Sequence, residues 1–200
     1  MRKIETTLYK FTELSEDVQK QVIEKYHDIN VEHEWYEETL AMHREKIEQK
    51  GFDVSTLHFK GFSSQGDGAM FTYNGFDDTL KEAAIESLQL LEREKKVLKN
   101  AYLSGKGSQS GLYYHERSCS HQIYFEPDGL KGYSNIEALV DEVSSEIEYY
   151  IKQLYEQLCE DLYSDLRELY YELTSDECVS DALHVSSYEF YQNGTLYKNY

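Results

Sequence analysis

The chain has 200 residues and a formal net charge of −18, with 38 Asp and Glu residues against 20 Lys and Arg. A surface of this sign repels nucleic acid and anionic membranes, and it attracts basic protein surfaces at long range. Hydrophobic residues make up 40% of the chain and aromatic residues 14%, which excludes wholesale disorder. The length suits a single domain covering residues 1–200.

The sequence shows no signal for secretion or for membrane insertion. Its first residues turn polar before an apolar region develops, and no run approaches the ~20 apolar residues that span a bilayer. The cysteines Cys119, Cys159 and Cys178 are odd in number and widely spaced, without a CxxC or His-rich grouping. We therefore expect free thiols in a reducing cytoplasm, with no disulfide framework, no metal site and no cofactor.

The first fifty residues predict a short strand followed by two helices. Ile4–Phe11 has the character of a strand or an extended lead-in. Ser15 is a candidate N-cap for a helix that ends near Asp28, because acidic residues follow it at once. A second helix is expected from Glu32 to Lys50, with Gly51 just beyond its end.

The apolar period then changes from helical to alternating. Residues 54–62 and 69–73 have strand character, and the turn Ser63–Gly68 between them contains two glycines, so we expect a β-hairpin. A charged helix is predicted from Asp77 to Tyr102.

The glycine- and serine-rich stretch Gly105–Gly111 predicts a flexible loop. Beyond it, residues 112–116 and 121–125 resemble the two strands of a second hairpin, which ends at Glu126–Gly129.

The longest periodic run follows, with apolar residues three or four apart from Ile136 to Leu173. This seam can pack on its own sheet or pair with its copy in a homodimer. Ser175 is expected to cap a short final helix. The pattern predicts an α+β fold: an antiparallel sheet of four to six strands, helices packed on one face, and a long acidic C-terminal helix. Its parts are a core over residues 1–130, the helix over 135–175, and a closing strand or hairpin over 186–200.

Negative charge is concentrated along the predicted long helix. Between Glu137 and Asp181 there are fourteen acids and two bases, so this segment carries −12 of the total charge. The charge can serve solubility alone. Like charges at i, i+4 are mildly unfavourable, however, and regularly spaced carboxylates imitate a nucleic-acid backbone, with tyrosines adding contact area. The predicted partner-binding residues are Glu148, Glu156, Glu160, Asp161, Asp165, Glu168, Glu172, Tyr155 and Tyr163.

A second candidate site is formed by Gln65 and Asp67 of the glycine-flanked turn with His115 and Glu116. These side chains can bind a small ligand or take part in acid–base chemistry. The alternative is structural: Asp67 hydrogen-bonds its own turn, and the histidine is partly buried and hydrogen-bonded. No residue spacing here forces two metal ligands together.

Gly61–Ala69 is the most distinctive stretch of the sequence, with further support from Leu14–Glu16, Asn30, Trp35, Tyr114–Ser118 and the Tyr188–Gly194 ending. Together these stretches resemble a group of small bacteriophage and prophage proteins for which no activity is established. The resemblance implies a phage accessory protein in the host cytoplasm, a class that often inhibits host defence.

These observations favour an acidic inhibitor that occupies the basic groove of a host nucleic-acid enzyme, such as a CRISPR effector or a restriction enzyme. Such a protein binds no nucleic acid and no membrane itself. The alternatives are a small enzyme or ligand-binding domain that uses the Asp67 turn, and an antitoxin-like protein whose partner is a basic toxin.

Overall fold

The computed structural model describes residues 5–126 and 134–197, and for residues 134–136 it describes the backbone alone. The chain divides into two compact units. The larger is Glu38–Asp165, and the smaller combines Met1–Glu37 with Leu166–Tyr200. The single domain expected from the sequence stays a prediction; coincident unfolding transitions from several probes would test it.

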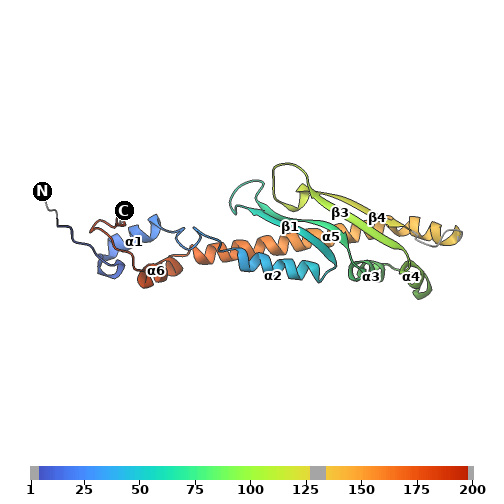
Figure 1. The fold of residues 1–200 in the computed structure, drawn as a ribbon, viewed down its shortest axis with the longest axis horizontal. Helices are drawn as coiled ribbons and strands as arrows, with labels where there is room; N and C mark the ends of the chain where they lie inside the picture. Colours follow the sequence, from blue (N-terminus) through green and yellow to red (C-terminus); the bar gives the residue numbers. More distant parts are fainter. Residues whose placement is uncertain (1–4, 127–133, 198–200) are drawn as a thin grey trace. The chain divides into compact units, whose positions relative to one another are not determined.

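The larger unit is built on a four-stranded antiparallel sheet with the strands in chain order (Figure 1). This confirms the predicted α+β class and the antiparallel sheet. The strands are β1 (Phe52–Lys60), β2 (Gly68–Phe76), β3 (Tyr102–Gln109) and β4 (Cys119–Glu126).

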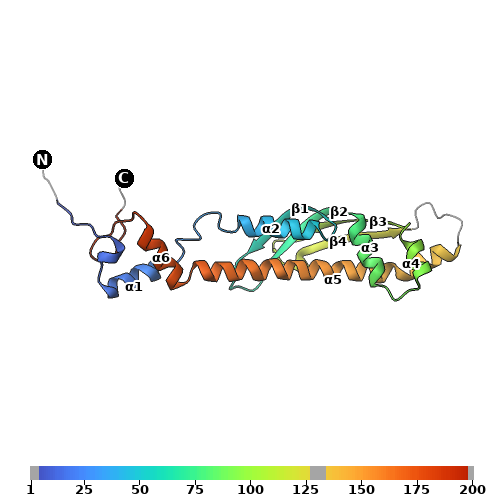
Figure 2. The same ribbon diagram turned by 90° about the horizontal axis from the view of Figure 1, so that it is seen from below.

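Helices cover one face of this sheet, and α5 runs along it as Figure 2 shows. The predicted long helix is confirmed, and it continues without a break through Leu158. The helices of this part of the chain are α2 (Glu37–Glu48), α3 (Asp78–Ser87), α4 (Glu92–Leu98) and α5 (Ser134–Leu173).

The core of the larger unit lies between α5 and the inward-facing residues of the strands. Phe71 and Tyr73 alternate toward the helix, while Ile147 and Ile151 of α5 point back, and all four are completely buried. The buried Tyr155 O–H donates to the Phe71 carbonyl at 2.8 Å. In this unit the apolar seam of α5 is therefore covered by its own sheet, which removes it as a surface for pairing with a second copy.

The single helix predicted from Asp77 to Tyr102 is wrong, because α3 and α4 are separate helices. Side chains bond the backbone at the end of α3 and at the start of α4. The Ser87 hydroxyl donates to the Ala84 carbonyl, and the Glu94 carboxylate accepts the Leu91 N–H. These local hydrogen bonds offer the backbone an alternative to continuing the helix.

The flexible loop predicted at Gly105–Gly111 is also wrong, since most of it belongs to β3. A Cβ atom on Gly107 would collide with the ring of Tyr73, and one on Gly105 would collide with Phe76. The glycines let these aromatic rings lie directly on the strand.

The second hairpin therefore has a different first strand from the one predicted. β4 pairs with β3, whereas residues 112–116 form a loop that leads into a 3-10 turn at Glu116–Ser118. The end predicted for the hairpin at residues 127–129 lies outside the described residues.

The smaller unit packs α1 (Glu16–Lys25) and α6 (Asp176–Val185) around a second apolar cluster that includes Phe11 and Phe190. Both helices were expected, and Ser175 caps α6 by accepting the Cys178 N–H.

The two terminal segments of this unit meet in isolated bridges rather than in strands. Tyr9 pairs with Phe190, and Phe190 pairs with Leu196 around a turn in which Gly194 has a φ of 76°. The expected lead-in and closing hairpin take this reduced form, and residues 1–4 and 198–200 lie outside the description.

No helix within the described residues combines the length and apolar character needed to cross a membrane. The cytoplasmic location expected from the sequence stays a prediction.

Candidate functional site

Four exposed glutamates follow the outward side of α5 in the larger unit. At about 100° per residue, Glu142, Glu146, Glu156 and Glu160 fall within an arc of about 80° around the helix, opposite the buried residues that face the sheet. Among the described residues none of the four carboxylates takes part in an ion pair. Tyr149, 66% exposed, lies between them. We call these four glutamates the acidic stripe.

Three of the acids predicted to bind a partner are instead paired inside the larger unit. Glu148 forms an i, i+4 pair with Lys152. Asp161 lies 2.8 Å from the Lys46 ammonium, and Asp165 lies 2.8 Å from the ring Nε2 of the buried His43.

The pair with Lys46 also changes the pKa of Asp161. The hydrogen bond from Lys46 lowers the pKa of the Asp161 carboxyl below its usual value. Because Glu148 and Asp161 are paired with lysine ammonium groups, they contribute less net charge to the surface than the stripe does, and the Asp165 carboxylate is engaged with the His43 ring.

The two tyrosines predicted at the binding surface lie elsewhere. Tyr155 has no exposed area and bonds Phe71, so its expected outward position is wrong. Burial raises the pKa of the Tyr155 hydroxyl and keeps it neutral. Tyr163 is partly buried, with its ring stacked on Phe62 at a centroid distance of 5.6 Å.

Glu168 and Glu172 belong to the smaller unit, on the final turns of α5, and both are exposed. They are therefore not counted with the acidic stripe.

The predicted ligand-site residues surround one cavity of about 600 Å³ at the end of the sheet. In Figure 1 the loop between β1 and β2 and the loop between β3 and β4 lie at that same end. A side chain at Gly68 would collide with His115, so the absence of one lets the two loops approach closely. This loop cavity is lined by Gln65, Gly66, Asp67, Tyr113, His115, Glu116 and Arg117.

Several polar groups of the loop cavity hold its own backbone. The Asp67 carboxylate accepts the N–H groups of Ser63 and Ser64 at 2.9 and 2.6 Å. His115 Nδ1 accepts the N–H of Arg117 at 3.1 Å, so the proton of a neutral ring is on Nε2. The structural interpretation of Asp67 is thus what the geometry shows. The Glu116 carboxylate lies 3.5 Å from Arg117 Nε and 3.7 Å from His115 Nδ1 in the same cavity.

A second cavity, of about 460 Å³, adjoins the first and shares Asp67, Glu116 and Arg117 with it. Its other wall is α5, where it reaches Glu156 and Glu160 of the acidic stripe and the ring of Tyr163. Cys159 also lines it, and burial raises the pKa of this thiol to about 12, so the sulfur is a poor nucleophile. The two sites predicted separately are therefore neighbours.

The sequence did not reveal a polar cluster inside the core. His121 Nδ1 lies 2.9 Å from the Tyr73 hydroxyl, and the His121 ring contacts Tyr155 edge-on. Burial, together with the nearby charge of Lys152, lowers the pKa of His121 to about 4. The imidazole is therefore neutral near pH 7. Period-two alternation on β4 places His121 inward, and that signal was available in the sequence.

Within the described part of the chain, no group of three or more His, Cys, Asp or Glu side chains is arranged to hold a metal ion. The expectation that the protein needs no cofactor stays a prediction.

The fold and the site together define an acidic α+β protein whose long helix carries a stripe of exposed carboxylates outside the ion pairs of the described residues. The chain belongs to the family described as a domain of unknown function, DUF8835, whose model matches residues 35–176. This match includes the whole of the larger unit. No curated protein and no solved structure matches the chain.

Proposed function

We propose that this protein is a binding protein that docks the acidic stripe of α5 onto the basic groove of a nucleic-acid enzyme and keeps nucleic acid out. The observation that carries the proposal is the set of four exposed carboxylates without internal ion pairs on a helix whose opposite side is packed in the core. Neighbouring acids, by contrast, are neutralised within the unit.

The geometry of the stripe suits a groove that normally holds a charged backbone. From Glu142 to Glu160 the helix rises ~27 Å at 1.5 Å per residue. Packing of its other side on the sheet fixes the backbone of α5, so docking costs little backbone entropy, although each glutamate side chain that it orders still has an entropic cost. Electrostatic attraction would accelerate association and make it sensitive to salt.

The resemblance of Gly61–Ala69 to phage proteins supports a target in host defence, such as a CRISPR effector or a restriction enzyme. An antitoxin-like role would use the same stripe against a basic toxin. Identifying the captured partner separates these two targets.

The first test is capture of the partner by the tagged protein at ~50 mM and ~500 mM salt, followed by inhibition of the purified enzyme. We expect a basic nucleic-acid enzyme that is retained at low salt and released at high salt, because the shorter Debye length screens the attraction. Reversing the stripe (Glu142→Lys, Glu146→Lys, Glu156→Lys, Glu160→Lys) should abolish both binding and inhibition.

A matched control changes four other exposed acids of the larger unit and alters the net charge equally: Glu38→Lys, Glu45→Lys, Asp53→Lys and Glu82→Lys. Binding should survive these changes apart from a slower association rate. If the stripe variant inhibits as well as the unmodified protein, the proposal is wrong.

The loop cavity favours a second candidate function, the binding of a small polar ligand. The supporting observation is that Gln65, Asp67, His115 and Glu116 line one space. A ligand that raises the melting temperature should lose its effect in Gln65→Ala and Glu116→Ala, which remove cavity groups without touching the hydrogen bonds of Asp67. Gln109→Ala, an exposed change outside the lining, is the control. Equal stabilisation of all variants would exclude this site.

A further inference from the structure

The two edges of the sheet differ in how their backbone is protected. Along β1 the Arg44 guanidinium, from α2, donates to the carbonyls of Val54 and Ser55 at 2.9 and 3.3 Å. The register of β1 also shifts on both sides of Val54. Bulges and covering side chains are the devices by which proteins prevent an edge strand from pairing with another chain.

β4 forms the opposite edge and has neither device. It pairs with β3 residue for residue from Cys119 to Glu126, without a register shift. Within the described residues, no side chain of another element hydrogen-bonds to its backbone. Figure 1 shows β4 on the side of the sheet away from α2. An edge of this kind presents unpaired N–H and C=O groups that accept another strand.

The side chains of β4 suit an added strand on both faces. Ile123 and Phe125 point toward the core, whereas Gln122 and Tyr124 point to the open face, where Tyr124 is 53% exposed. A strand added alongside β4 would therefore extend the apolar face of the sheet that packs on the core and the uncharged polar face that is open to solvent.

We propose that β4 pairs antiparallel with β4 of a second copy of this chain, which joins the two sheets into one across a twofold axis. Identical strands are self-complementary in this arrangement, as a twofold interface requires. The free backbone N–H and C=O groups of β4 on one copy thus hydrogen-bond to the same groups of β4 on the other copy.

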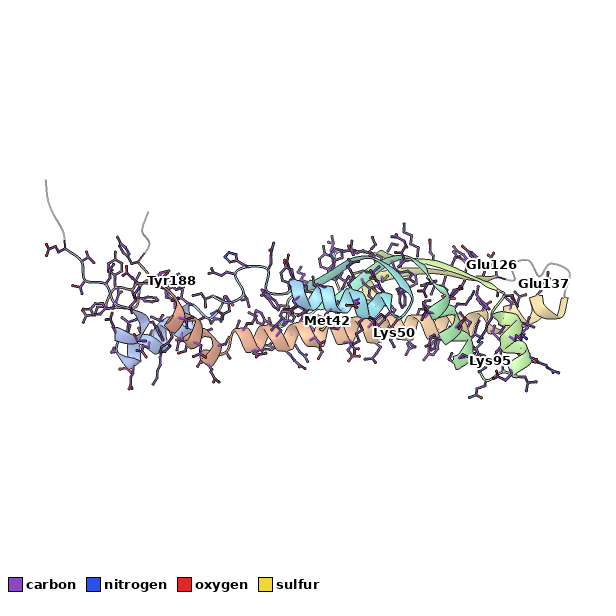
Figure 3. All side chains as sticks on the ribbon, turned by 60° about the horizontal axis from the view of Figure 1, so that its bottom comes forward. Met42, Lys50, Lys95, Glu126, Glu137 and Tyr188 are labelled. Carbon is purple, nitrogen blue, oxygen red and sulfur yellow. The ribbon has the colours of Figure 1, made fainter. Side chains whose placement is uncertain are left out.

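The scarcity of charged residues on β4 allows a second copy of this acidic chain to approach this edge of the sheet. Two chains of −18 repel, but the only charged residue of β4 is Glu126, at the end of the strand in Figure 3. In a pair centred on Gln122, the two Glu126 residues lie about eight residues apart along the pair, about 27 Å at ~3.4 Å per residue. That separation exceeds the Debye length of about 8 Å at physiological salt, so this edge brings the copies together with little local repulsion.

The test is association measured by sedimentation velocity from ~5 to ~500 µM, the range expected for an interface of one strand pair. We expect a monomer–dimer equilibrium. Added salt should strengthen it by screening the like charge of the copies, in contrast to the salt-weakened binding expected of the acidic stripe. A protein that remains monomeric over the whole range would overturn the proposal.

Hydrogen exchange locates the interface in the same samples. Alternate amides of β4 should gain protection as the concentration rises, while amides on the outer edge of β1 should not change. Concentration-dependent association without added protection in β4 would place the interface elsewhere and refute the pairing.

A matched pair of variants completes the test. Gln122→Glu places like charges opposite each other at the centre of the strand pair, while it faces Lys106 within its own sheet, and we expect roughly 3- to 5-fold weaker association. Ser104→Glu puts the same charge on the same face of the neighbouring strand β3, away from the edge, and should leave the dimer within about twofold. Equal effects of both variants would contradict edge pairing. Circular dichroism would confirm that both proteins are folded.

Discussion

Tyr155 and Glu156 are adjacent in the sequence and only about 100° apart around α5, yet one faces the core and the other faces solvent. Tyr155 is completely buried and donates its hydroxyl hydrogen to Phe71, whereas Glu156 is exposed and outside every ion pair of the described residues. The inward side of the helix holds polar groups that are neutral and hydrogen-bonded. The outward side holds exposed, charged groups. The difference shows that α5 serves stability with one side and leaves carboxylates exposed on the other.

The pKa shifts follow the same division. Burial raises the pKa of the Tyr73 and Tyr155 hydroxyls and lowers that of His121, so the uncharged form is favoured in each case. Substitutions on the two sides of α5 should therefore have different consequences.

The largest expected effect is on the inward side. Tyr155→Ala should lower the free energy of unfolding by about 3–5 kcal/mol, because it opens a cavity and leaves the Phe71 carbonyl without its partner. Tyr149→Ala, on the outward side, should change it by no more than about 0.5 kcal/mol. Urea unfolding measures both. If the two variants lost similar free energies of unfolding, the two sides of α5 would not differ in their contribution to stability.

A pH titration sharpens the comparison next. Unfolded His121 titrates near 6.5 and the folded residue near 4, so below pH 6.5 the unfolded chain binds a proton that the folded chain does not. The contribution of His121 is thus complete above pH 6.5 and decreases as the pH falls toward 4, by up to about 3 kcal/mol at ~1.4 kcal/mol per unit. His121→Gln should remove this step from the pH dependence of urea unfolding. An unchanged slope between pH 6.5 and 4.5 would contradict the assignment.

The smallest effect distinguishes paired from unpaired acids. Glu160→Gln removes a like-charge i, i+4 contact with Glu156 and should stabilise the protein by about 0.2–0.5 kcal/mol. Asp161→Asn removes the exposed pair with Lys46 and should destabilise it by up to about 1 kcal/mol. Changes of the same sign in urea unfolding would show that the acidic stripe is not distinct from its neighbours.

The sequence predicted the parts of the fold in which one local signal dominates. Apolar residues three or four apart located α5, and the glycines of the Ser63–Gly68 turn located the first hairpin. Where tertiary contacts override local preference, the prediction failed. Gly105 and Gly107 resemble a loop until the rings of Tyr73 and Phe76 are seen to occupy the space of their side chains.

The candidate sites show the same limit. Gln65, from a predicted turn, and His115, from a predicted strand, were grouped although they are far apart in the sequence, and the structure brings them to one cavity. Tyr155 was misplaced because a tyrosine suits either a core or an interface, and its position relative to the sheet decides between them. The pairing of Asp161 with Lys46 joins residues of α5 and α2 that no sequence pattern connects.

The close approach of Tyr73 to Gly107 has a consequence for how this family tolerates change. A saturation scan would find almost every substitution at Gly107 depleted, as at a catalytic residue, although the position touches no candidate site. Its neighbour Lys106, exposed on the other face of the same strand, should accept most residues. Intolerance to substitution at Gly107 would therefore reflect the space that the Tyr73 ring occupies. A scan that measures function alone would wrongly assign this glycine to a functional site.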